Sequence, residues 1–365
     1  MGLASLLLAG CGGALSGGGT GGTGIASGTG GSRVTGLGNF GGSTVGTGGL
    51  GGGPAGMNCG SVDTPPATPI LSDVLIVLDA SAAMNDDATD TPCSGGCGAS
   101  SKWAQTVAAI EKLVGDTELT VNWGLQIFPD PGTACGVAGS VAVPVGPARA
   151  TAIAAAIGAR TSANGGVIAG GDAPIRDAVR GATDHLSRLT EVGPKLILLA
   201  TAGEPSCPVG GSDAGAGDAT GAVQAIVDAR NAGVPTTVLG IAAAGGMAAM
   251  TLDAMAVEGG VPRTGSPRYT PVANIGELTS GSHTLIAVKP PCILAVPQPP
   301  SDATSRSRIR VRVDDTEIPR DPNHLNGWDF FDPSQSAVEL YGPACETLMS
   351  GPHTVTIAFI CGPIP

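Results

Sequence analysis

The sequence predicts a doubly wound α/β fold with a mostly parallel sheet, followed by a small, disulfide-stapled, β-rich module. Residues 74–78 form a continuous apolar run with β-branched members, typical of a strand buried on both faces of a parallel sheet. Farther along the chain, apolar runs alternate with segments of helical periodicity, the order that builds such a sheet with helices on both faces. From Cys292 onward, short alternating segments separated by turn signals predict strands instead.

Each element follows from its local pattern. Trp103 and Ile110 belong to an apolar set at helical spacing, so residues 102–114 are predicted to form a helix. Asp218 stands where it would cap another helix, and Trp103 and Trp123 are predicted core residues rather than ligand platforms. The other strands are predicted at 121–128, 196–200, 234–241, 307–313, 336–341 and 353–361, and the other helices at 148–157, 174–189, 218–232 and 251–257.

Oxygen-bearing side chains follow the first predicted strand. From position 72 the chain reads SDVLIVLDASAAMNDD, which places Asp79 and Ser81 at the carboxyl end of that strand. Ligands and hard cations bind at this end of open α/β sheets. The D-x-S spacing resembles the metal-site loop of von Willebrand factor A (vWA) domains, whose pattern is D-x-S-x-S, although Ala83 takes the place of the second serine.

Two later segments extend the resemblance. GDAPIRDAV at 171–179 resembles the second vWA metal loop, with Ala173 where the family has threonine. LILLATAGEP at 196–205 is similar to the family strand that ends in T-D-G-E-P, with Ala202 at the aspartate. The resemblance implies a vWA domain of bacterial secreted or lipoprotein type with a degenerate metal-ion-dependent adhesion site. The residues at its five positions are Asp79, Ser81, Ala83, Ala173 and Ala202.

The alanines bear on metal binding at this site. A hard divalent cation takes about six oxygen ligands, and a methyl group supplies none. We therefore expect binding of Ca²⁺ or Mg²⁺ to be impaired or absent, with no cofactor assigned with certainty. In the alternative interpretation, Asp79 and Ser81 only satisfy backbone amides of the following turn.

A second cation site is a candidate next to the first. In integrin β-subunit I-like domains the loop continues as D-x-S-x-S-x-x-D-D, and Asp86 and Asp87 occupy the paired positions here. Ca²⁺ bound there would relieve repulsion between the carboxylates. The alternative is an acidic loop that is simply solvated.

The amino-terminal segment predicts export. Leu8, Ala9, Gly10 and Cys11 resemble the bacterial lipobox, so residues 1–11 are interpreted as a lipoprotein-type signal segment acylated at Cys11, although no Lys or Arg precedes Arg33. Residues 12–69, rich in Gly, Ser, Thr and Pro, are interpreted as a flexible tether. The alternative is a Gly-rich leader with a chance cysteine. The expected location is the cell envelope, as an outer-membrane lipoprotein or a secreted protein. The vWA domain then spans 70–291 and the β-rich module 292–365.

Cysteine usage supports an extracytoplasmic location. With Cys11 set aside, the other cysteines form an even set suited to disulfides. Cys135 and Cys207 fall on loops that the vWA fold places at one end of its sheet, so their pairing is plausible, but the sequence does not determine it. The disulfide candidates are Cys59, Cys93, Cys97, Cys135, Cys207, Cys292, Cys345 and Cys361.

Composition narrows the function. The net charge is −12, and the alternating arginines from Arg306 to Arg312 suit a strand with one solvated face, so no nucleic-acid partner is expected. No histidine follows Ser81 closely enough to predict a hydrolase, and no nucleotide-binding loop motif is present.

The remaining prediction is a non-enzymatic binding or adhesion module with an unknown protein or surface ligand. Its binding face would carry Asp79, Asp86, Asp87, Asp172 and Glu204. Two alternatives stay open: a structural or assembly subunit of an envelope complex, and Ca²⁺-dependent adhesion through Asp86 and Asp87.

Overall fold

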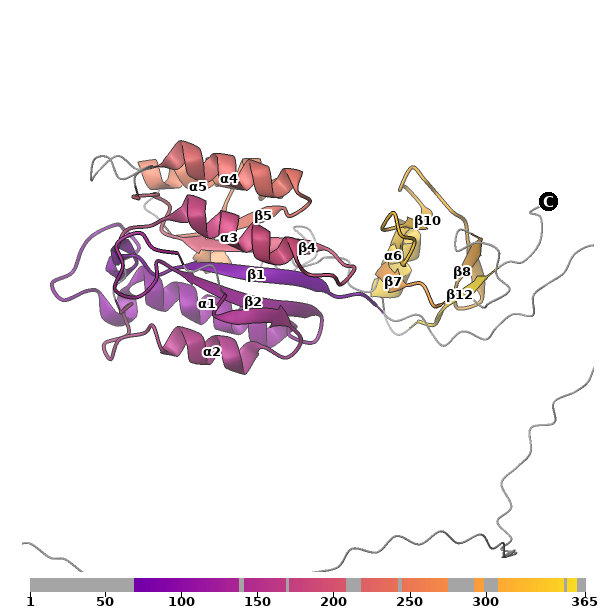
Figure 1. Ribbon diagram of the computed structural model, residues 1–365, viewed down its shortest axis with the longest axis horizontal. Helices are drawn as coiled ribbons and strands as arrows, with labels where there is room; N and C mark the ends of the chain where they lie inside the picture. The colour runs from indigo at the N-terminus through magenta and orange to yellow at the C-terminus, as the bar shows by residue number, and fades with distance from the viewer. Residues whose placement is uncertain are drawn as a thin grey trace, which may run out of the picture. The chain divides into compact units, whose positions relative to one another are not determined.

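The computed structural model (Figure 1) describes residues 69–137, 141–168, 171–207, 218–241, 245–274, 292–298, 308–350 and 353–359. Within these residues there is one six-stranded sheet in the order β3-β2-β1-β4-β5-β6 and two three-stranded sheets. Cys11, Cys59 and Cys361 lie outside the described residues, and so does the predicted tether up to residue 68.

The six-stranded sheet is mostly parallel. Its strands are β1 (Ser72–Asp79), β2 (Val121–Phe128), β3 (Val143–Gly146), β4 (Lys195–Thr201), β5 (Thr236–Gly240) and β6 (Thr270–Pro271). β1 pairs in parallel with both β2 and β4, and only the edge strand β3 runs antiparallel to its neighbour. All eight residues of β1 are buried because the strand has a neighbour on each side and helices on both faces.

Helices cover both faces of this sheet (Figure 1). They are α1 (Lys102–Thr117), α2 (Ala150–Gly158), α3 (Ile175–Ser187), α4 (Ala219–Asn231) and α5 (Met247–Glu258). Alternate residues of β1 enter two separate cores: Ile76 packs in the cluster with residues of α1 and α2, and Val77 in the cluster with residues of α3, α4 and α5. The predicted doubly wound α/β fold is confirmed.

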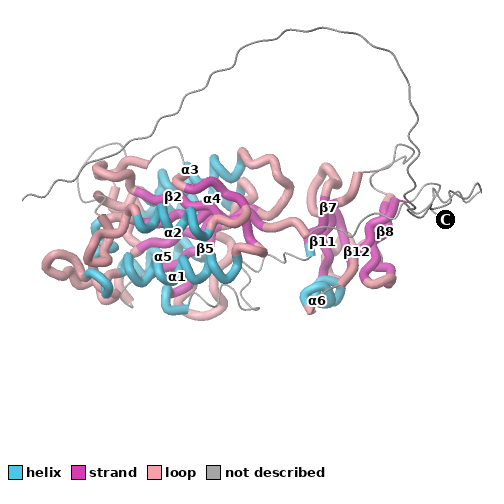
Figure 2. The backbone as a smooth tube through the Cα atoms, turned by 90° about the horizontal axis from the view of Figure 1, so that it is seen from below, coloured by secondary structure: helices cyan, strands magenta, loops and turns pink. Residues whose placement is uncertain are grey.

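The carboxyl-terminal residues build two small antiparallel sheets and a short helix (Figure 2). The elements are β7 (Ile293–Ala295), β8 (Ile309–Val313), β9 (Thr316–Ile318), β10 (Gly327–Phe330), β11 (Ala337–Tyr341), α6 (Pro343–Met349) and β12 (Val355–Phe359). They share a hydrophobic cluster that includes Trp328 and the Cys292–Cys345 disulfide. Along β8, buried residues alternate with the exposed Arg310 and Arg312, as predicted for a strand with one solvated face.

Several element boundaries differ from those predicted. The α5 helix begins at Met247, four residues before the predicted start, so it includes the MAAM segment that directly follows Gly246. The strand β3 was not predicted because it contains Pro144, which a strand tolerates only at an edge such as this one. The α6 helix was also missed, and Pro343 stands in its first turn, where proline is favoured. No helix among the described residues is long and apolar enough to span a bilayer.

Three disulfides lie within the described residues: Cys93–Cys97, Cys135–Cys207 and Cys292–Cys345. The predicted use of cysteines in disulfides is confirmed for these six. Cys135–Cys207 joins the loop after β2 to the loop after β4, two loops that meet at the carboxyl edge of the sheet.

Removal of Cys135–Cys207 should be more costly than removal of Cys93–Cys97. The first bridge spans 72 residues and the second 4, so the chain-entropy model gives losses of about 4 and about 2 kcal/mol, respectively. Denaturant unfolding of the two double Cys→Ser variants measures the difference. Equal losses would contradict the larger contribution that the longer loop predicts for Cys135–Cys207.

Candidate functional site

A cavity of about 390 Å³ opens at the carboxyl end of β1. It is lined by the loop after β1, the start of α1, residues 171–172, the loop after β4 and the start of α5. Most of the predicted site residues line it, together with Asp172 and Glu204 from the predicted binding face. Those brought together are Asp79, Ser81, Ala83, Asp86 and Ala202. Ala173 and Asp87 are not among the lining residues.

The loop after β1 is held from two directions. Ala80 N–H donates to the carbonyl of Phe128 at the end of β2, at 2.6 Å, and Ala82 N–H donates to the carbonyl of Gly171, at 3.0 Å. The chain then enters a short 3₁₀ helix, Ala82–Asn85. These contacts fix the backbone on which Asp79 and Ser81 stand.

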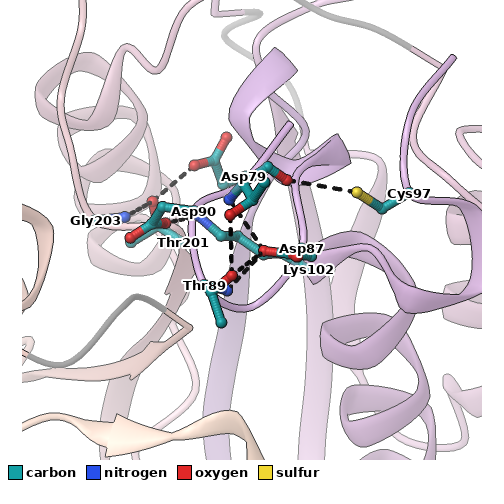
Figure 3. Close-up of polar contacts among 9 residues, drawn as sticks. Asp79, Asp87, Thr89, Asp90, Cys97, Lys102, Thr201 and Gly203 are labelled. Carbon is teal, nitrogen blue, oxygen red and sulfur yellow. Dashed lines mark hydrogen bonds and ion pairs between the residues drawn. The ribbon is translucent and has the colours of Figure 1, made fainter. Parts of the chain in front are cut away.

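Asp79 is a buried carboxylate held by two donors. One oxygen accepts the Ser81 amide at 2.8 Å. The other accepts the Thr201 hydroxyl at 2.7 Å (Figure 3). The same Thr201 hydroxyl accepts the Gly203 amide at 3.2 Å. Burial raises the pKa of Asp79 above its ordinary value, although the Thr201 and Ser81 donors act in the opposite direction. The contact with the Ser81 amide is the one expected if Asp79 closes the following turn.

Ser81 leaves a polar atom unused. The residue is 2% exposed, and its hydroxyl oxygen has no hydrogen-bond partner among the described residues. The hydroxyl is close enough to Asp79 to favour the ionised carboxylate, but it is not in hydrogen-bonding geometry with it. A buried polar group without a partner is costly.

Lys102 was not predicted as a site residue, yet its buried side chain lines the same cavity. The side chain is 3% exposed and its ammonium forms an ion pair with Asp90, another lining residue (Figure 3). A buried ammonium is tolerated only when it is paired. The sequence signal was a lysine at the first position of a predicted helix.

Asp86 and Asp87 have different surroundings. One oxygen of Asp87 accepts the Thr89 amide at 2.8 Å, the Thr89 hydroxyl at 2.7 Å and the Thr91 amide at 3.0 Å. These donors, with the Thr89 hydroxyl first, lower the pKa of Asp87. Asp87 thus closes a turn of its own loop, whereas Asp86 lines the cavity.

The donor set fits a bare divalent cation poorly. Within the part of the chain that the structure describes, a single group of three Asp, Glu, His or Cys ligand atoms gathers within 4.8 Å, and it consists of Cys135, Asp172 and Cys207. Both cysteines are in a disulfide and offer no thiolate. Ala83 and Ala202 contribute methyl groups to the cavity wall, and Lys102 brings a positive charge to it.

Comparisons with known proteins give structural likenesses only. No protein-family model matches the chain, and no curated protein sequence matches it. Among solved structures, the conserved hypothetical protein BatB from Bacteroides thetaiotaomicron is 21% identical over 47% of this chain and 66% of its own, with a TM-score of 0.31. The pilus adhesin SpaC from Lactobacillus rhamnosus GG, in its open conformation, is 12% identical over 81% of this chain and 39% of its own, with a TM-score of 0.43. Manganese-loaded TRAP protein from Plasmodium vivax is 11% identical over 80% of this chain and 94% of its own, with a TM-score of 0.40.

The chain spans less than two thirds of the BatB and SpaC chains. The assignment of the site therefore rests on the residues of this chain.

Replacing Asp79 by Asn should change the pH dependence of stability. Because the folded-state pKa of Asp79 is raised, the folded protein binds more protons than the unfolded chain between the two pKa values, and wild-type stability falls as pH rises through that window. Asparagine does not titrate. The free energy of unfolding of Asp79→Asn should therefore rise relative to wild type as the pH increases above the ordinary aspartate pKa of about 4.

Denaturant unfolding at several pH values measures this difference. Asp79→Ala serves as the comparison, because it removes the charge and also leaves the Ser81 amide and Thr201 hydroxyl without their acceptor, at a cost of about 1–3 kcal/mol relative to Asn. A difference between Asp79→Asn and wild type that stays constant with pH would contradict the burial of an ionisable carboxyl here.

Proposed function

We propose that this chain is a non-enzymatic binding module of vWA type that contacts its partner through the cavity at the carboxyl end of β1, without a divalent cation. The observation that carries the proposal is the buried Lys102 ammonium, ion-paired with Asp90, in the cavity that also contains Asp79 and Ser81.

Both the positive charge in the cavity and the small number of oxygen ligands favour a cavity without a metal ion. An ammonium group repels a divalent cation brought into the same space of low dielectric constant, and this repulsion adds to the cost of dehydrating the ion. Methyl groups at Ala83 and Ala202 remove oxygen ligands that would offset that cost. Lys102 also takes up the charge of Asp90, one of the carboxylates that would otherwise attract a cation.

The surroundings of Ser81 favour binding over catalysis. A nucleophilic serine needs a base within hydrogen-bonding reach, and no described histidine lines this cavity. Asp79, the nearest carboxylate, is already engaged by the Ser81 amide and Thr201. The three disulfides favour an oxidising compartment, so the module would act outside the cytoplasm, with Cys11 as its proposed point of lipid attachment.

Divalent cations should leave the melting temperature unchanged. A ligand that binds only the folded state at 100 times its dissociation constant stabilises that state by about 2.7 kcal/mol, which a thermal melt detects. We expect no shift on adding millimolar Ca²⁺, Mg²⁺ or Mn²⁺ after treatment with a chelator, because the cavity lacks a cation-binding donor set.

The Asp86→Ala, Asp87→Ala double variant is the control for the neighbouring loop. A cation-induced rise in melting temperature that disappears in this variant would replace the proposal with Ca²⁺-dependent adhesion through Asp86 and Asp87. A rise that survives in the double variant but disappears in Ser81→Ala would place the ion at the degenerate site and also overturn the proposal.

A further inference from the structure

We infer that the cavity receives a lysine or arginine side chain of the partner protein, with its cationic group near Ser81 and among the carboxylates of Asp86, Asp172 and Glu204. The inference rests on the proposed function and names the chemistry of what binds there. It follows from the charge of the cavity, from the unused Ser81 hydroxyl and from the spacing of the lining oxygens.

The cavity carries more negative than positive charge. Lys102 and Asp90 pair with each other. Asp86, Asp172 and Glu204 also line the cavity, and none of them makes an ion pair with any described residue. A cation entering the cavity would therefore meet uncompensated carboxylates, and field lines concentrated in a cleft would strengthen that attraction.

The Ser81 hydroxyl supplies an acceptor in the interior. Its oxygen is buried and has no partner in the described part of the chain, and it belongs to a residue that lines the cavity. An ammonium carries three N–H donors and a guanidinium five, so one incoming group can satisfy Ser81 and a carboxylate together. Binding would remove the cost of the unsatisfied hydroxyl, which points to a ligand with N–H donors rather than an apolar one.

Size separates an organic cation from a metal ion. A divalent ion draws its oxygen ligands to within about 2.6 Å of itself, and the carboxylates here are not gathered in that way. An alkyl cation with several donors can bridge wider gaps. The cavity volume of about 390 Å³ is near the lower end of ligand pockets and suits one long side chain.

The cavity walls also fit the stem of such a side chain. Ala82, Ala83 and Ala202 line it, with Ala248 and Met247 from the start of α5. Long cationic side chains pack their methylene groups on apolar surface while the charged end finds a polar partner. The methyl groups that replace the expected metal ligands thus form part of the apolar wall.

A carboxylate ligand bound to Lys102 is the main alternative. It is disfavoured because the Lys102 ammonium is already paired with Asp90 and is 3% exposed. An incoming carboxylate would also face Asp86, Asp172 and Glu204. The Glu peptide in the titration that follows tests this alternative.

Titration of the full chain with capped tripeptides tests the inference. The peptides are acetyl-Gly-X-Gly-amide with X as Lys, Arg, norleucine or Glu, and saturation-transfer NMR reports the dissociation constant of each. Binding of the Lys or Arg peptide at least about tenfold tighter than that of the norleucine and Glu peptides is expected. Preference for the Glu peptide would assign the site to Lys102, and equal binding of all four would also overturn the inference.

A further arm separates a protein side chain from a free amine. n-Butylamine carries the ammonium and all four carbons of the lysine side chain but no peptide backbone. It should bind less tightly than the Lys peptide. Equal or tighter binding of n-butylamine would assign the cavity to a small amine and overturn the assignment to a partner protein.

Paired variants locate the binding. Asp172→Asn with Glu204→Gln removes two carboxylates from the cavity, and Ser81→Ala removes the unused hydroxyl. The matched control, Asp116→Asn with Glu118→Gln, removes two carboxylates at the far end of α1, outside the cavity lining. Melting temperatures check that the variants fold. We expect the cavity variants to bind the cationic peptide about tenfold more weakly than wild type, and the control variant to bind it as tightly as wild type. Equal binding in the cavity double variant and the control would overturn the site.

Failure of the inference and failure of the proposed function are distinguishable. The absence of any peptide binding, together with no cation-induced change in melting temperature, overturns the inference and leaves a metal-independent module in place. A cation-induced rise in melting temperature overturns the proposed function whatever the peptides do.

Discussion

The site depends on the hydrogen bonds that the buried carboxylate of Asp79 accepts. This carboxylate stands at the last residue of the central strand β1, and Thr201, which donates to it, is the last residue of the adjacent strand β4. One buried side chain therefore ties together the carboxyl ends of two parallel strands and, through the Ser81 amide, the start of the following loop. Burying a carboxylate is costly, and these two donors offset that cost where the chain must turn away from the sheet.

A disulfide and hydrogen bonds join the surrounding loops. The Cys135–Cys207 disulfide connects the loops after β2 and β4. Between residues 171–173 and the loop after β4, the Ala173 amide donates to the Ser206 hydroxyl at 2.8 Å, and the Ser206 amide donates to the Ala173 carbonyl at 3.3 Å. The backbone of Ala173 takes part in a contact between loops. The disulfide and these hydrogen bonds thus connect the loops that surround the cavity.

The strands and helices were predictable from sequence where periodicity was strong. The strand at residues 121–128 has the predicted limits, Trp103 and Trp123 are fully buried, and Asp218 caps α4 by accepting the Gly221 amide. Each of these depends on local pattern or on apolar character, which a sequence states directly.

The limits of sequence interpretation appear in the irregular loops. Asp86 and Asp87 are neighbours in the chain, yet one lines the cavity and the other closes a turn with Thr89 and Thr91. No periodicity sets the direction of a side chain in such a loop. Lys102 was missed for a related reason: its place at a helix start was visible, but its burial depends on where the loop containing Asp90 folds back.

The position of Lys102 also affects the balance of positive and negative charge in the cavity. A positive charge in the first turn of a helix is unfavourable, because the unpaired amides there already form the positive end of the helix dipole. The lysine is stable only if nearby carboxylates outweigh that dipole, and the ion pair with Asp90 does this for one charge. The acidic residues of the remaining loops exceed what Lys102 requires, since Asp86, Asp172 and Glu204 have no ion-pair partner among the described residues. The cationic partner side chain proposed above would meet these carboxylates and would bring the N–H donors that Ser81 lacks among the described residues.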